Sequence, residues 1–372
     1  MRAETTTSRL ARLGFRSPSE AAPLLDEVEG VLGDRVDDLR LAADPDRALQ
    51  SFARLHRSGV PLAPTLADAG AGASLLRVLG ASSGLAACIE RAPELLEALV
   101  PMALPSAETL RDRLLDAVAD PELPRADAIV ALRRRYRWHL VEIVAFDLAQ
   151  QDPVAHVQAV SAALADAATA ALEASLVVAR RTVAARFGAD DVAATRLAVI
   201  GMGKTGAREL NVLSDVDVIW VHDADESLAE DRAAMVAQAL ARETTAGCME
   251  PSREPMLWEV DANLRPEGKD GVLTRTLASH VAYYERWARS WEFQALLKAR
   301  AVAGDAELGA AYEEAVRSKV WQSSSREGFV ESVQRMRERV TDHIPADEVD
   351  WQLKLGPGGL RDVEFTIQLL QL

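Results

Sequence analysis

Two acidic residues, Asp215 and Asp217, lie two positions apart at the start of an apolar segment, and a third, Asp261, ends a later one. Side chains two residues apart on a strand point to one face of the sheet. Carboxylates crowded on one face repel each other unless a cation lies between them. Hard oxygen ligands suit Mg²⁺ shared with substrate phosphates, and two such ions could align an in-line phosphoryl displacement. We therefore expect Asp215, Asp217 and Asp261 to be catalytic and to bind two Mg²⁺ ions.

For an isolated pair of this spacing, an Asx turn of Ser214 and Asp215 that leads into a strand would be the favoured interpretation. Three neighbouring features favour the metal site. A glycine turn precedes the pair at short range, Asp261 lies on a later strand, and Arg265 follows it in the segment LRPEG.

Four further residues are candidates for binding the phosphates of a nucleotide. Gly203 would let the backbone approach a phosphate, or would simply form a tight turn. Ser214 could donate to a phosphate oxygen or cap the strand. Lys204 and Arg265 could neutralise phosphate charge, although an exposed ion pair is an open alternative for each.

The glycines of segment 201–206 match two familiar nucleotide-binding patterns that we reject. Gly201, Gly203 and Gly206 fit the dinucleotide pattern G-x-G-x-x-G. However, a parallel crossover needs about a dozen residues or more, and only residues 207–214 separate these glycines from the next predicted strand. The P-loop pattern would require a glycine at Ala198.

The elements around these residues predict an α+β fold, a mostly helical protein with an inserted small mixed sheet. Residues 155–187 carry apolar side chains at spacings of three and four, which is typical of a helix. Buried strands are predicted at 197–200, 217–222 and 257–261, and a helix at 228–245. Tyr284, Trp287 and Trp291 share a helical stripe, for which a place in the helix core is favoured over adenine stacking.

The composition disfavours some classes of function. Among 372 residues, 42 are basic and 57 acidic, so the net charge is −15 and a nucleic-acid partner is disfavoured. The two cysteines, Cys88 and Cys248, show neither metal spacing nor a disulfide framework. No stretch approaches about 18 uncharged apolar residues, so we expect no membrane partner and a cytoplasmic location.

Several segments together resemble the glutamine synthetase adenylyltransferase family, also called glutamate-ammonia-ligase adenylyltransferases, over roughly residues 75–372. In chain order these segments are GMGKTGARELNVLSDVDVIWV, EVDANLRPEG, YYERWARSWEFQALLKAR and LKLGPGGLRDVEF. The resemblance implies a nucleotidyltransferase domain of the polymerase-β type, built on a mixed sheet with a glycine turn, a D-x-D pair and a third Asp. Thr205 and Asn263 depart from the residues common in that family, and neither departure touches the carboxylates.

That family has two homologous halves, an adenylyl-removing half followed by an adenylyl-adding half. A single motif set follows a long helical region that begins at Met1, which resembles the removing half. The resemblance implies phosphorolytic removal of AMP from a glutamine synthetase tyrosine, with Mg²⁺ as cofactor and ADP or ATP as the nucleotide. It implies glutamine synthetase and the PII nitrogen-signal protein as partners.

Two other functions remain open at this point, ATP-dependent adenylylation of the same tyrosine and a non-catalytic nucleotide-sensing half. We expect a helical region over 1–125, a nucleotidyltransferase domain with its flanking helices over 126–310, and the start of a truncated helical domain over 311–372. The last segment is amphipathic and lacks a helix C-cap, which is typical of a fragment of a longer chain.

Overall fold

The computed structural model describes residues 5–100, 103–342, 344–345, 347–349 and 351–372. The chain divides into two compact units, one of Met1–Ala117 with Val130–Ala167 and one of Val118–Ile129 with Ala168–Leu372. The division expected from the sequence, 1–125, 126–310 and 311–372, stays a prediction.

The first unit is helical. Polar residues placed just before its helices start them: Asp44, Asp68 and Ser82 each accept a hydrogen bond from a backbone N–H of the first turn that follows. Apolar side chains such as Leu49, Phe52 and Leu75 form its fully buried core. The helices are α1 (Thr6–Arg12), α2 (Pro18–Leu32), α3 (Pro45–Arg57), α4 (Ala63–Ala67), α5 (Ala69–Ala81), α6 (Ser83–Arg91) and α7 (Ala107–Asp116).

Two long helices, α8 (Arg125–Ala149) and α9 (Pro153–Phe187), contribute residues to both units. The predicted helix over 155–187 is confirmed by α9. This helix is also long and apolar enough, by length and composition alone, to cross a membrane. Its most apolar stretch is 72% buried in the protein, as in the core helix of a soluble protein.

The second unit contains a mixed sheet of five strands within the described residues. The central strands β1 (Thr195–Gly201) and β2 (Val216–Ala224) are antiparallel, and β5 (Arg300–Gly304) is antiparallel to β1. Two short strands, β3 (Val260–Asp261) and β4 (Thr274–Thr276), run parallel to β2. Since 67% of the structure is helical and this sheet is mixed, the predicted fold class is confirmed.

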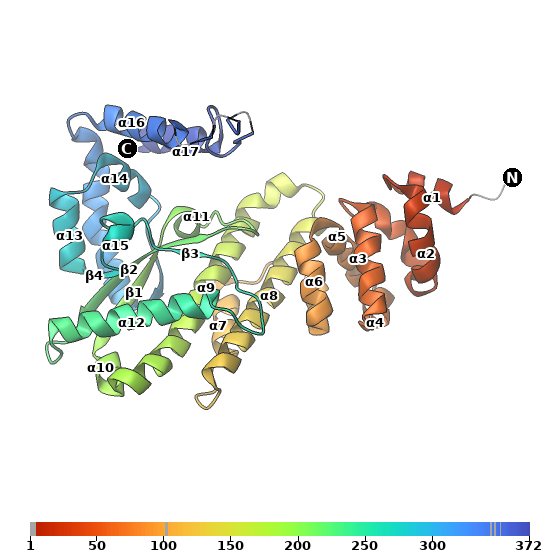
Figure 1. Cartoon of the computed structure of the whole chain (residues 1–372), viewed down its shortest axis with the longest axis horizontal. Coiled ribbons are helices and arrows are strands. Elements are labelled where there is room, and N and C mark those ends of the chain that lie inside the picture. Colours follow the sequence, from red (N-terminus) through yellow and green to blue (C-terminus); the bar gives the residue numbers. More distant parts are fainter. Residues whose placement is uncertain (1–4, 101–102, 343, 346, 350) are drawn as a thin grey trace. The chain divides into compact units, whose positions relative to one another are not determined.

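The two faces of the sheet are covered by different helices. Ile200 and Ile219 lie in one buried cluster with side chains of three helices, α13 (Leu277–Arg286), α14 (Ser290–Leu296) and α15 (Ala306–Trp321). The predicted helix at 228–245 is observed as α12 (Glu230–Met249), which packs against β1 and β2 and lies alongside these strands in Figure 1. Asp217 lies two residues before Ile219 on β2, so its side chain points to the same face as the cluster of α13 to α15.

Among the described residues, the second unit also contains four further α-helices: α10 (Ala189–Ala193), α11 (Gly203–Ala207), α16 (Phe329–Asp342) and α17 (Leu360–Gln371). The predicted strand at 257–261 is shorter than expected, although the Glu259 carbonyl still accepts a hydrogen bond from Val216 N–H. The predicted aromatic stripe was wrong, because the helix ends at Arg286 and a new one starts at Ser290. Tyr284 is buried, Trp287 is 74% exposed and Trp291 lines a cavity.

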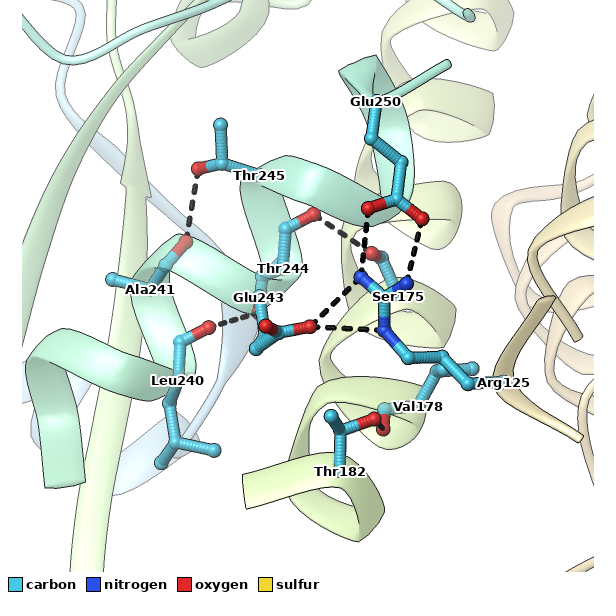
Figure 2. Close-up of polar contacts among 10 residues, drawn as sticks. All are labelled: Arg125, Ser175, Val178, Thr182, Leu240, Ala241, Glu243, Thr244, Thr245 and Glu250. Carbon is cyan, nitrogen blue, oxygen red and sulfur yellow. Dashed lines mark hydrogen bonds and ion pairs between the residues drawn. The ribbon is translucent and has the colours of Figure 1, made fainter. Parts of the chain in front are cut away.

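Figure 2 shows the polar network that ties the start of α8 to α12. Arg125 donates through Nη1 and Nη2 to both carboxylate oxygens of Glu250 (2.6 and 3.0 Å) and through Nε to Glu243 (3.0 Å). Beside it, Ser175 Oγ on α9 donates to the Thr244 carbonyl of α12 (2.8 Å). These contacts fix α12, and therefore one face of the sheet, to the surrounding helices.

We expect Arg125→Ala to lower the free energy of unfolding by about 1–2 kcal/mol, because two partly buried carboxylates would lose their shared partner. Arg317→Ala is the matched control, since its ion pair with Glu314 is 59% and 72% exposed. That substitution should cost less than about 0.5 kcal/mol. Urea unfolding of both variants measures the difference. Equal losses would mean that the network of Figure 2 stabilises the protein no more than an exposed ion pair does.

Candidate active site

The three acidic residues predicted from the sequence lie on or beside two paired strands, β2 and β3. Asp217 pairs in parallel register with Asp261, and Asp215 lies immediately before β2. Burial, together with the charges of Asp215 and Asp261, raises the pKa of Asp217 to about 6. Lys354 and Lys204 act in the opposite direction. The site is therefore one in which negative charge is crowded and partly desolvated.

This arrangement fits a divalent cation in charge and in ligand chemistry, because a cation would relieve the repulsion that raises the pKa of Asp217. Within the residues that the structure describes, no three acidic, histidine or cysteine side chains already converge to hold a metal ion. Asp215, Asp217 and Asp261 remain the residues that would hold Mg²⁺, and their role as ligands stays a prediction.

Gly203 allows the carboxylate of Asp217 to approach the glycine turn. Its φ is +50°, which favours glycine, and a Cβ atom there would lie 2.6 Å from Asp217 Oδ2. The neighbouring Met202 N–H donates to the Asp217 carbonyl (2.8 Å). The structure therefore assigns Gly203 a close approach to Asp217, and its predicted approach to a phosphate is untested.

Lys204 and Ser214 lie beside the acidic residues and line the same cavity. Lys204 Nζ donates to Asn211 Oδ1 (3.0 Å) and to Ser214 Oγ (3.3 Å). These contacts hold a positive charge next to Asp215 and Asp217, where a phosphate group of a substrate could meet it.

Arg265, the other predicted phosphate contact, is directed toward its own loop. Its guanidinium donates to the backbone carbonyls of Ala262 (2.8 Å), Lys269 (3.1 Å) and Gly271 (3.0 and 3.1 Å). It is not one of the residues that line the cavity. Arg265 therefore shapes the loop that follows Asp261, and its predicted contact with phosphate gains no support from this geometry.

The cavity beside the acidic residues has a volume of about 320 Å³. Three cationic residues that the sequence analysis did not identify line it, Lys298 after α14, Lys354, and Arg361 on α17. Lys298 Nζ donates to Glu209 (3.0 Å) and Glu364 (2.9 Å). Burial alone would lower the pKa of Lys298, but these two hydrogen bonds raise it.

These three cationic residues lie in segments that resemble the family, but the sequence analysis predicts no role for their side chains. Lys298 belongs to FQALLKAR, while Lys354 and Arg361 belong to LKLGPGGLR. The apolar walls of the cavity come from Leu264, Trp291, Met336 and Phe365. The lining thus combines charged groups that suit phosphate with apolar and aromatic side chains that suit a flat ring.

A sequence model of the family described as glutamate-ammonia ligase adenylyltransferase matches residues 72–315. A second, described as GlnD PII-uridylyltransferase, matches residues 327–372.

Curated relatives give the same result. Proteins named bifunctional glutamine synthetase adenylyltransferase/adenylyl-removing enzyme are 53% identical in Leifsonia xyli subsp. xyli, 47% in Streptomyces avermitilis and 44% in Mycolicibacterium smegmatis. The matches cover 100%, 100% and 98% of this chain and 38%, 37% and 36% of the relatives. The chain therefore spans little more than a third of their length.

Proposed function

Because the chain belongs to the glutamate-ammonia ligase adenylyltransferase family, we propose that its cavity removes AMP from an adenylylated tyrosine of glutamine synthetase by phosphorolysis. The family model and the curated relatives confirm the family that was predicted from the motifs. The names of the relatives include both an adenylyltransferase and an adenylyl-removing activity, so the direction of the reaction in this chain is our proposal.

The observation that carries the proposal is the charge distribution around one cavity. The lining includes three carboxylates and four cationic side chains: Asp215, Asp217 and Glu364, and Lys204, Lys298, Lys354 and Arg361. Inorganic phosphate and the AMP phosphodiester are both anions, so their approach requires positive charge and alignment more than a general base. The charge of Lys354 acts to lower the pKa of Asp217, and Lys354 is our first candidate to hold the incoming phosphate.

In the proposed reaction, a phosphate oxygen attacks the phosphorus of the AMP group. A new phosphorus–oxygen bond forms to this phosphate, and the bond to the tyrosine oxygen breaks. The products are ADP and a tyrosine hydroxyl, which gains a proton given up by the phosphate. Mg²⁺ held by Asp215, Asp217 and Asp261 would supply Lewis-acid stabilisation of the phosphate oxygens.

The decisive experiment uses glutamine synthetase that carries labelled AMP on its tyrosine. We expect label to be released as ADP, and release to fall at least about tenfold when phosphate is omitted. Free AMP released without phosphate would mean hydrolysis. Transfer of label from ATP to unmodified synthetase would mean that the site works in the adding direction, and no turnover would favour a nucleotide-sensing role. Each of these outcomes would refute the proposal.

A variant tests the phosphate contact separately. Lys354→Met should raise the apparent KM for phosphate at least about tenfold, because a charge-assisted contact worth about 1.5–3 kcal/mol is removed. Lys269→Met is the control, since Lys269 is exposed and is not one of the cavity residues. If both variants behave alike, Lys354 does not hold the phosphate.

Glutamine synthetase is the partner that this proposal requires. The PII nitrogen-signal protein as a second partner and a cytoplasmic location both stay predictions.

A further inference from the structure

One buried polar atom in the cavity lacks a hydrogen-bond partner. Gln294 on α14 is 2% exposed and lines the cavity. Its Nε2 donates to the Phe365 carbonyl of α17 (3.4 Å), whereas its Oε1 has no hydrogen-bond partner among the described residues.

The hydrogen bond to Phe365 fixes which way the amide of Gln294 is turned. A backbone carbonyl only accepts hydrogen bonds, so the nitrogen of the amide must face it and the oxygen must face elsewhere. Leaving a buried acceptor unsatisfied costs about 1–3 kcal/mol. Such groups are rare in native structures and require an explanation, for which a ligand that donates a hydrogen bond is suitable.

The surroundings of Gln294 suit a purine base. Trp291, on the same helix, and Phe365, on α17, give the cavity aromatic surface, and Leu264 and Met336 add apolar surface. Flat aromatic rings pack well against such side chains. Small-ligand sites typically combine mostly apolar walls with a few fixed polar groups, at volumes of about 300–1,000 Å³.

We propose that Gln294 selects adenine over guanine, by accepting a hydrogen bond from the exocyclic amine of adenine at Oε1. The inference rests on the proposed function, since it assumes that the nucleotide binds in this cavity. Adenine presents an amino donor at its six position, whereas guanine presents a carbonyl acceptor there. Guanine would therefore leave Gln294 Oε1 unpartnered and facing another oxygen.

Binding of nucleoside diphosphates to the full chain tests this directly by calorimetry in the presence of Mg²⁺. Wild-type protein should bind ADP at least about tenfold more tightly than GDP, because the lost hydrogen bond and the opposed acceptors together cost at least about 1.4 kcal/mol. Purine riboside diphosphate, which lacks the amine, should also bind at least about tenfold more weakly than ADP. This comparison of ligands requires no variant.

Gln294→Met keeps the length of the side chain and removes the acceptor, so the ratio of GDP to ADP dissociation constants should fall to about one. Gln368→Met is the matched control. Gln368 lies on α17 and lines the same cavity, but its amide donates to Glu364 (3.5 Å). The control should keep the preference for ADP.

Equal binding of ADP and GDP by the wild-type protein would overturn the inference, as would an unchanged ratio in Gln294→Met. Preference for ADP without phosphorolysis would support base selection and refute the proposed function. Failure of the wild-type protein to bind either nucleotide would overturn both.

Discussion

Asp217→Asn should lower turnover at least about a hundredfold, which corresponds to about 2.7 kcal/mol of activation free energy. The substitution keeps the shape of the side chain but removes one of the charges that would hold the cation. Asp217 pairs with Asp261 across β2 and β3, and the charges of Asp215, Asp261, Lys204 and Lys354 all act on its pKa. Steady-state release of label as ADP from AMP-modified glutamine synthetase measures the loss.

The same substitution should stabilise the metal-free protein. The pKa of Asp217 is about 6 in the folded protein against 3.8 for the ordinary carboxyl group. When folding raises the pKa of a carboxyl group, its contribution to the free energy of unfolding is fully present below the pKa of the unfolded state. That contribution is lost as the pH rises through the pKa of the folded state. Above about pH 6 the penalty is about 3 kcal/mol, and Asn removes it.

Urea unfolding between pH 4 and pH 8 separates these effects. Wild-type protein should lose stability relative to Asp217→Asn between about pH 4 and pH 6, and added Mg²⁺ should restore stability to the wild-type protein only. Asp225→Asn is the control, because Asp225 is exposed and follows the same strand. It should change neither turnover nor stability appreciably. A fully active Asp217→Asn enzyme would refute the assignment of the acidic site.

The acidic site could be recognised from sequence because its signal is local. Asp215 and Asp217 precede an apolar segment whose alternation sets the face to which they point, and this holds whatever lies around the strand. Their pairing with Asp261 is different. β3 is only two residues long, and its parallel alignment with β2 depends on contacts made far along the chain. The presence of Asp261 suggested that its strand lies near β2, but the sequence did not predict the register of the two strands.

The cationic side of the cavity could not be predicted because it depends on tertiary packing. Lys298, Lys354 and Arg361 carry no periodic pattern that distinguishes them from solvent-exposed basic residues. Only the packing of α14 against the last helices turns them toward the same cavity. The strands β4 and β5 were missed for a related reason. They are short and only partly buried, so they lack the continuous apolar run of a central strand.

Three glycines, at 201, 203 and 206, imitate a dinucleotide-binding pattern, and the structure shows a different reason for each. A Cβ on Gly201 would lie 2.8 Å from a methyl group of Val302 on β5. One on Gly203 would meet the carboxylate of Asp217, and one on Gly206 would overlap the carbonyl oxygens of Lys298 and Gly201. The spacing therefore reflects close packing of α11 against β1, β2 and β5.

Gly206→Ala should consequently be the most destabilising of these substitutions, costing at least about 3 kcal/mol of unfolding free energy. The added methyl group would overlap backbone atoms, which cannot move aside as a flexible side chain can. Arg300 also holds this turn, donating to the carbonyls of Gly206 (2.9 Å) and Thr205 (3.1 Å), so any shift would strain these bonds.

Gly30→Ala is the control for Gly206→Ala, since Gly30 lies inside α2 with nothing within 4 Å of the added Cβ. It should stabilise the protein by about 0.4–1 kcal/mol, because alanine is the better helix former and restricts the unfolded chain. Urea unfolding of the two variants gives the comparison. If Gly206→Ala folds with wild-type stability, close packing does not explain this glycine. An approach to a nucleotide phosphate would then be the better explanation, and ADP binding by that variant should be weakened instead.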